Sequence, residues 1–266
     1  MKYIRQVMQT VKKESPILYT IVWMHFIMAM GSAIGLLIDD RILMGVNVWI
    51  KPLKFTVSSG IYILTLGFLI TFYPFSRLKK HIVRNIVSWT LLFEILIIVV
   101  QGARGVLSHY NVTSALNGML FGMMGLLIAI NVLVMVFFII ETIRLKLNTA
   151  RSVQWAILLG WIIVLFGSWI GSQMIAQLGH NVGVADGGDG LPLLNWSTVA
   201  GDLRVAHFFG LHSIQLLPLL AYVLFRKWNA PQRTQITTMI LTGLLYASWV
   251  GYVFYQAKRE IPFLHI

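Results

Sequence analysis

The chain has 266 residues, of which 58% are apolar and only 11% are charged, and its formal net charge is +12. The mean hydropathy is +0.78. A soluble globule of this size could not hide so much apolar surface, because even a chain of about 300 residues leaves about a quarter of its unfolded surface in water. This composition excludes an ordinary soluble enzyme, a disordered chain and a secreted disulfide scaffold. Cysteine is absent, which excludes disulfides, thiolate metal sites and iron–sulfur clusters.

Uncharged stretches long enough to cross a membrane recur along the chain. A transmembrane helix needs about 20 mostly apolar residues. The first stretch, residues 15–38, is longer than the apolar region of a signal peptide. We expect an all-α, polytopic membrane protein, a single domain over residues 1–266 that forms a bundle of seven transmembrane helices. The expected spans are 17–38, 55–75, 85–103, 115–140, 153–178, 205–225 and 235–256.

The distribution of Lys and Arg over the short loops predicts the orientation of the chain. With the N-terminus inside, 14 of the 21 basic residues lie on the inner side. We therefore expect the N-terminus inside and the C-terminus outside. The inner basic residues are divided among four short segments, which favours the lipid bilayer as partner and argues against nucleic acid.

The expected outer loop at residues 179–204 is the longest connection in the chain. Loops of this length are usually functional or disordered, and we expect this one to cap the bundle. Asp186 and Asp189 flank two glycines within it. These residues suit tight turns, and they also suit a cation such as Ca²⁺, although the EF-hand spacing is absent.

Residues 180–218 carry the strings Asp-Gly-Gly-Asp-Gly-Leu-Pro, Asn-Trp-Ser, Gly-Asp-Leu-Arg and Ala-His-Phe-Phe-Gly-Leu-His. This stretch, about a sixth of the chain, resembles a segment of an uncharacterised family of bacterial multispan integral membrane proteins. The family has no assigned reaction. The resemblance implies a bacterial cytoplasmic (inner) membrane protein and transfers no catalytic role to any residue.

Two ionisable residues fall within expected spans, where such groups are costly and therefore candidates for function. Glu94 lies ten residues after Arg84, or about 15 Å into its helix, and His25 lies about 14 Å into the first helix. A hydrogen bond between His25 and Glu94 is geometrically feasible. The pair is a candidate catalytic site or proton relay, and equally a buried pair that fixes helix packing.

Several histidines on different helices suit a bis-imidazole haem b, whose iron takes axial His ligands. His109 and His207 match in height near the outer surface, and His25 with His212 is a second pairing. Nearby basic side chains suit haem propionates, a quinone headgroup or another anion. These basic residues are Lys51, Lys54, Arg104 and Arg204.

A transition-metal centre at the outer side is an alternative use of the same loops. Its candidate ligands are His180 and Asp202, joined by His109 and His207, with Asp186 and Asp189 as oxygen donors. A purely structural polar cap is the remaining alternative.

Three functional hypotheses follow from these residues. The first is a membrane oxidoreductase or cofactor protein that uses haem b or a transition metal. The second is a proton-coupled transporter or binding protein for a small anionic solute. The third is a structural partner of another membrane protein, and a homo-oligomer is also compatible with the sequence. No internal repeat is evident in the sequence, which argues mildly against a repeat-built transporter.

Overall fold

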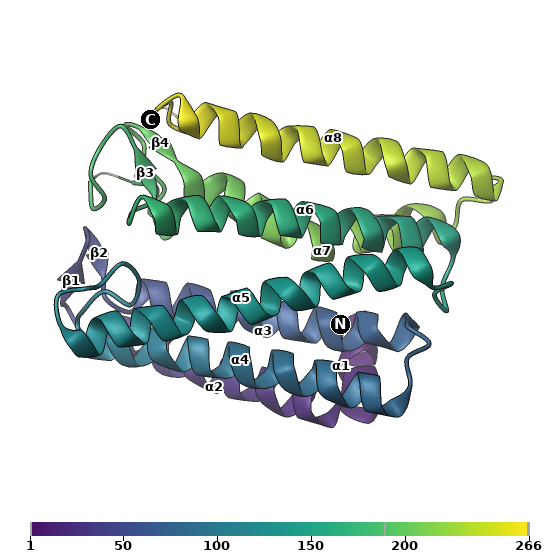
Figure 1. The fold of residues 1–266 in the computed structure, drawn as a ribbon, viewed down its shortest axis with the longest axis horizontal. Helices are drawn as coiled ribbons and strands as arrows, with labels where there is room; N and C mark the ends of the chain where they lie inside the picture. Colours follow the sequence, from purple (N-terminus) through teal and green to yellow (C-terminus); the bar gives the residue numbers. More distant parts are fainter. Residues whose placement is uncertain (1, 189, 265–266) are drawn as a thin grey trace. The chain divides into compact units, whose positions relative to one another are not determined.

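The computed structural model describes residues 2–188 and 190–264, and most of them are helical (Figure 1). Within these residues, seven helices are long and apolar enough to cross a membrane. The protein is therefore a multipass helical membrane protein by the length and composition of its helices. The helices are α1 Lys2–Glu14, α2 Pro16–Ile38, α3 Ile50–Leu69, α4 Arg77–Ala103, α5 Ala115–Arg144, α6 Arg151–Ala176, α7 Leu203–Phe225 and α8 Gln232–Lys258.

Several helices begin before the spans expected from charge, whereas α3 and α6 end before the expected limits of 75 and 178, at Leu69 and Ala176. α3 begins at Ile50 rather than residue 55, and α4 begins at Arg77 rather than residue 85. The limits of the expected spans were set at Lys and Arg residues. These residues are good helix formers with long side chains, so a charge ends the apolar stretch without ending the helix. A short helix, α1, also precedes the first span.

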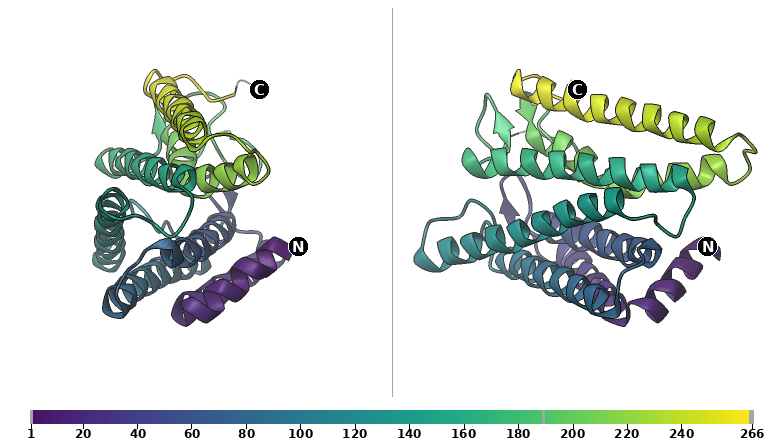
Figure 2. Two further views of the ribbon diagram at one scale, coloured as in Figure 1. Left: turned by 90° about the vertical axis from the view of Figure 1, so that its right-hand side faces the viewer. Right: turned by 45° about the vertical axis from the view of Figure 1, so that its right-hand side comes forward.

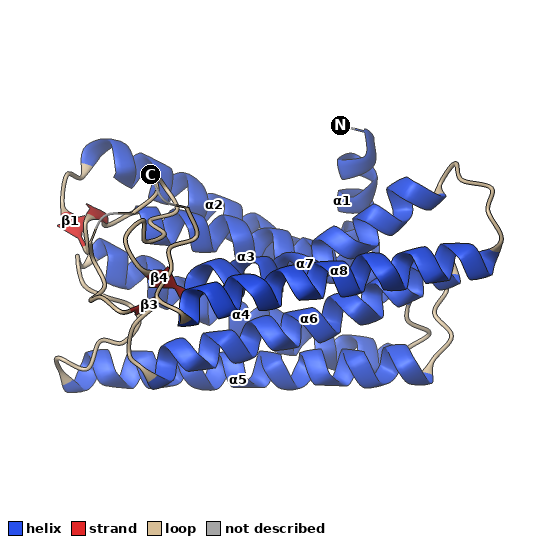
Figure 3. Ribbon diagram, turned by 90° about the horizontal axis from the view of Figure 1, so that it is seen from above, coloured by secondary structure: helices blue, strands red, loops and turns tan. Residues whose placement is uncertain are grey.

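The chain divides into two compact units, Met1–Val134 and Met135–Ile266, with the boundary inside α5. The single-domain organisation expected from the sequence stays a prediction. In the first unit, α2, α3 and α4 pack side by side, and α1 crosses the direction of α2 (Figure 3). Val11 anchors α1, because its buried side chain lies where a Cβ on Gly67 of α3 would be.

The second unit is organised by a close approach of α6 and α7, which run side by side (Figure 2). A Cβ on Gly210 would lie 2.6 Å from the Cα of Gly167, so the two backbones are in contact. Ser213 and His207 of α7 bond to the carbonyls of Gly160 and Gly167 at 2.9 and 2.7 Å. Small residues permit this approach, and interhelical hydrogen bonds reinforce it, as is common between transmembrane helices.

Both units contain the same order of elements, which is a helix, two short antiparallel strands, and two further helices. In the first unit this order is α2, β1, β2, α3 and α4; in the second it is α6, β3, β4, α7 and α8. The second strands end alike, because Asn47 and Asp202 each accept a hydrogen bond from the backbone N–H two residues later at 2.9 Å. The strands are β1 Ile42–Leu43, β2 Val46–Asn47, β3 Asn181–Val182 and β4 Gly201–Asp202.

The substitution Gly210→Ala tests the contact between α6 and α7. The added methyl group overlaps the Gly167 backbone, so we expect a loss of about 1–3 kcal/mol of stability. Thermal unfolding in detergent measures this loss as a lower midpoint. Gly251→Ala in α8 is the matched control, because a Cβ there meets nothing within 4 Å. Equal midpoints for the two variants would show that the contact does not limit packing.

Candidate functional site

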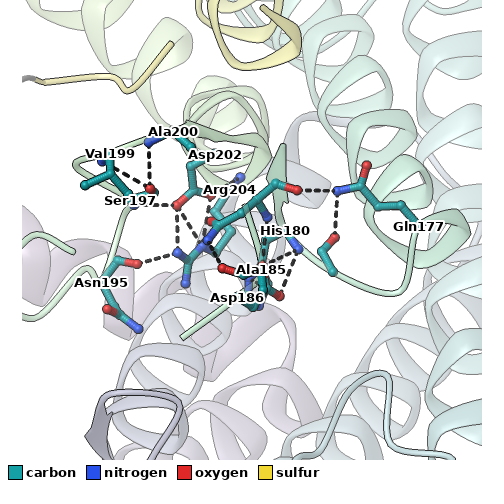
Figure 4. A network of polar contacts seen from close by, with 12 residues as sticks. Gln177, His180, Ala185, Asp186, Asn195, Ser197, Val199, Ala200, Asp202 and Arg204 are labelled. Atoms are coloured by element: carbon teal, nitrogen blue, oxygen red, sulfur yellow. Dashed lines mark hydrogen bonds and ion pairs between the residues drawn. The ribbon is translucent and has the colours of Figure 1, made fainter. Parts of the chain in front are cut away.

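The long loop of the second unit begins with an ion pair between His180 and Asp186 (Figure 4). The Nδ1 atom of His180 lies 2.6 Å from the Asp186 carboxylate. The backbone N–H groups of His180 and Asn181 also donate to this carboxylate, at 2.9–3.1 Å. Burial alone would raise the pKa of Asp186, but these hydrogen bonds and the His180 charge outweigh it and lower the pKa to about 2. Asp186 is therefore a carboxylate that closes a turn.

A second ion pair in this loop joins Asp202 and Arg204. The Arg204 guanidinium bonds to both oxygens of the buried Asp202 carboxylate, at 2.7–3.1 Å, and also donates to the carbonyl of Asn195. The backbone N–H groups of Ser197 and Arg204 also donate to Asp202, both at 2.9 Å. The charge of Arg204 is thus used to hold the loop against the start of α7.

The structure brings His180, Asp186, Asp202 and Arg204 into one region, since β3 pairs with β4 beside both ion pairs (Figure 4). The backbone N–H of Leu203 donates to the carbonyl of His180 at 3.0 Å. Across residues 2–188 and 190–264, no group of three or more His, Cys, Asp or Glu side chains could hold a metal ion. Asp189 lies outside the described residues, and the metal centre stays a prediction.

The first unit contains an analogous ion pair, Asp39 with Arg41, at its strand-bearing end. Arg41 bonds to both carboxylate oxygens of Asp39 at 2.6–3.2 Å and to the carbonyl of Ala103 at 2.9 Å. The indole N–H of Trp49 donates to the same carboxylate at 2.8 Å. The hydrogen bonds from Arg41, and then from Trp49, hold the pKa of Asp39 well below its ordinary range. This pair ties the turn after α2 to the end of α4.

The other candidates of the first unit are Arg104, Lys51, Lys54 and His109, and they do not share one set of contacts. Arg104 donates to the side chains of Gln101 at 2.5 Å and Asn117 at 3.2 Å. Lys51 and His109 meet at one aromatic ring, because the Lys51 Nζ atom lies 5.6 Å and the His109 ring 5.7 Å from Phe55. Lys54 is half-buried on the same helix.

The histidines of α7 have separate neighbours, as their five-residue spacing requires. His207 donates from Nδ1 to the carbonyl of Gly167, which leaves its Nε2 atom as an acceptor. The ring of His212 lies 4.4 Å from that of Phe208. The expected haem pairs, His109 with His207 and His25 with His212, each combine one residue from each unit, and they stay predictions.

The expected hydrogen bond between His25 and Glu94 is not formed among the described residues. Nδ1 of the buried His25 ring donates to the carbonyl of Ile21 at 2.8 Å, and Nε2 lies 3.2 Å from the hydroxyl of Ser59 on α3. Both ring nitrogens are therefore satisfied between α2 and α3. His25 packs these two helices together, because its Cβ also lies 3.3 Å from where a Cβ on Gly60 would be.

Glu94 is buried in α4 with only 5% of its surface exposed. Its Oε2 atom has no hydrogen-bond partner within the part of the chain that the structure describes. One helical turn away, Thr90 accepts a hydrogen bond of 2.7 Å from the amide of Asn131 in α5. The Oδ1 atom of Asn131 is also buried without a described partner. Among the described residues, the α4–α5 pair thus holds three buried polar oxygens without a partner, the third being the hydroxyl of Ser88 in α4.

The roles of Asn131 and Asn117 were not predicted, although the sequence carries a signal for both. The two residues are 14 positions apart in α5, which places them on nearly the same face of a helix with 3.6 residues per turn. Their partners, Thr90 and Gln101, lie eleven positions apart in α4, close to three full turns. A polar stripe shared by two neighbouring spans was therefore detectable.

Comparison of the chain with models of protein families, with curated proteins and with solved structures finds no match in any of the three. The membrane assignment is carried by the seven apolar helices. The bacterial family resemblance stays an expectation.

The pH dependence of stability tests the Asp186 turn. The pKa of Asp186 falls from its ordinary 3.8 to about 2 on folding. Its stabilisation is therefore complete above about pH 4 and is lost as the pH falls toward 2. At pH 6 we expect the melting temperature of Asp186→Asn to be lower than that of the natural protein. This difference in melting temperature should vanish by pH 2. Thermal unfolding across this range measures it.

Asp40→Asn is the control for this experiment, because Asp40 is an exposed carboxylate in the other unit. Its melting curve should follow that of the natural protein at every pH. A gap between Asp186→Asn and the natural protein that stays constant down to pH 2 would contradict the assigned role.

Proposed function

We propose that the protein is a proton-coupled transporter of a small anionic solute, in which Glu94 carries the proton. The observation that carries this proposal is the buried Glu94 carboxyl group, whose Oε2 atom lacks a described partner inside a span. Ionisable groups at such positions are costly and commonly mark ion pathways and proton relays. A carboxyl group held in an ion pair, such as Asp186, is a poorer proton carrier because its pairing with His180 favours the charged form.

Asn131 supports this role for Glu94. A protonated carboxyl group is a hydrogen-bond donor, and the Oδ1 atom of Asn131 is an acceptor still available on the α4–α5 pair. The Asn131 amide is fixed by its bond to Thr90, one turn from Glu94. The oxygens of Glu94 and Asn131 without a described partner thus favour a site that receives a proton or a small donor during a transport cycle.

The shared order of elements in the two units favours a transporter over a single-site enzyme. Many transporters are built from two repeats, and parallel repeats are related by an axis along the membrane normal. If all seven helices cross the membrane, α2 and α6 run in the same direction and α5 links two three-helix repeats. The distribution of basic residues favours an inside N-terminus, which would place the strand-bearing ends outside, and the inner membrane of a bacterium is the expected location.

Basic residues of the first unit support an anionic solute. Lys51 and Lys54 begin α3 and Arg104 ends α4, so all three lie at the strand-bearing end of this unit. Positive charge at the mouth of a pathway attracts anions from solution. Arg204 is less suited to this role, because both oxygens of Asp202 already bind its guanidinium.

Proteoliposomes with a trapped pH-sensitive dye test the proton role. Succinate, phosphate and gluconate are added outside in turn, and solute-driven acidification of the lumen is recorded. We expect at least one solute to acidify the lumen with the natural protein, and Glu94→Gln to abolish this signal, because an amide does not carry the proton. Glu94→Asp should retain part of the signal.

Glu260→Gln is the matched control, since it removes an exposed carboxylate after the end of α8. It should acidify the lumen as fast as the natural protein. The proposal fails if Glu94→Gln matches the natural protein or if none of the three solutes moves protons.

The geometry of His207 favours a second candidate, a haem b protein. Metal-binding histidines commonly donate their second ring N–H to a backbone carbonyl, which fixes the tautomer. His207 has this arrangement, with Nδ1 bonded to the carbonyl of Gly167 and Nε2 left as an acceptor. A haem held by Nε2 would supply one-electron redox chemistry.

The visible spectrum of purified protein, oxidised and then dithionite-reduced, tests this second candidate. We expect a Soret band that His207→Ala abolishes and that His81→Ala leaves unchanged, because His81 is an exposed residue at the start of α4. A flat spectrum after expression with ample haem would refute haem binding and leave the transporter proposal unaffected.

A further inference from the structure

A basic hollow lies at the end of the first unit opposite the β1–β2 strands, where α1 meets α2 and α4 begins. It has a volume of about 580 Å³. Four of its lining residues, Arg77, Lys80, His81 and Arg84, lie within two turns of α4 and share one side of that helix.

The guanidinium of Arg84 is the unusual feature of this hollow. Its Nε and Nη2 atoms are buried and have no hydrogen-bond partner in the described ranges 2–188 and 190–264. Leaving a buried charged donor unsatisfied costs more than leaving a neutral one. The two nitrogens form a fork, and a fork of this kind matches the two oxygens of a phosphate or carboxylate.

The charge of the hollow also favours an anion as its ligand. Arg77, Lys80 and Arg84 supply three positive charges, and the carboxylate of Glu14, which attracts the Arg84 charge, supplies one negative charge. The net charge of the lining is therefore positive. The hollow also lies at the N-terminal end of α4, where the helix dipole favours negative groups.

The neighbouring helix α1 favours a position of the hollow at the level of lipid headgroups. Val11 is buried against α3, while Arg5, Lys12 and Lys13 are exposed, so α1 is amphipathic. It crosses the direction of α2 at the end where α2 begins (Figure 3). Basic amphipathic helices of this kind lie in the membrane interface and favour anionic lipids.

We propose that this hollow binds a phosphate group, with the Arg84 guanidinium as its bidentate ligand and Lys80 and Arg77 as supporting charges. The group comes either from the headgroup of an anionic phospholipid or from a soluble phosphate. The site is independent of Glu94 and of the proposed transport activity, because its lining residues lie around the first turns of α4 and do not include Glu94.

Native mass spectrometry of the detergent-purified full chain tests the site. Phosphatidylglycerol and phosphatidylcholine are titrated separately, and inorganic phosphate is titrated against sodium chloride with the melting temperature as readout. We expect phosphatidylglycerol to bind more tightly than phosphatidylcholine. Arg84→Gln should weaken that binding by on the order of tenfold, because it removes a charge-assisted fork.

Arg233→Gln is the matched control, since it removes an exposed arginine at the start of α8. It should leave lipid binding unchanged. Lys80→Gln provides a second variant in case Arg84→Gln does not fold, and it too should weaken binding.

The outcomes separate the two phosphate sources. Selective binding of phosphatidylglycerol, lost in the hollow variants, identifies the lipid headgroup. A rise in melting temperature with inorganic phosphate alone, lost in the same variants, identifies a soluble phosphate. The proposal is overturned if neither ligand binds, or if Arg84→Gln and Lys80→Gln bind both ligands as tightly as the natural protein.

Discussion

A polar group inside a hydrocarbon layer must find its partners within the protein, and this constraint organises most of the molecule. Ser32, Thr56 and Thr142 bond back to carbonyls of their own helices. His25 uses both ring nitrogens, one on its own helix and one on α3. Against this background, a buried oxygen without a partner among the described residues, such as Oε2 of Glu94, calls for a ligand or a proton to explain it.

The charged side chains at the strand-bearing ends also find their partners within the protein, although they lie in loops. Asp39 with Arg41 and Asp202 with Arg204 adopt one local solution, in which the arginine binds the aspartate two residues earlier and then reaches a distant carbonyl. These arginines lock the turns between helices. A cluster of charged residues in the sequence therefore indicated loop architecture here, and the candidate proton site lies instead inside α4.

The repeat of elements shows how loop length conceals similarity. Only two residues separate β1 from β2, whereas eighteen separate β3 from β4, so the two units do not align by spacing. The strands nevertheless pair alike, with Ile42 opposite Asn47 and Asn181 opposite Asp202. The backbone hydrogen bonds therefore show a similarity between the two units that the sequence spacing does not. The spacing differs because loops accept added residues at low cost.

The sequence by itself determined the membrane class, the number of long apolar helices and their approximate positions, because hydropathy over about 20 residues reports directly on the cost of burial in lipid. It also identified Glu94 as an unusual charge in a span. Only the tertiary structure decided which polar groups have partners. The Arg204 charge is neutralised by Asp202, and His25 bonds to Ser59 rather than Glu94. Two buried nitrogens of the Arg84 guanidinium have no hydrogen-bond partner among the described residues. The partner of a polar side chain depends on which helix faces meet and how closely they approach. Contacts between helices, such as that of Gly167 with Gly210, determine both.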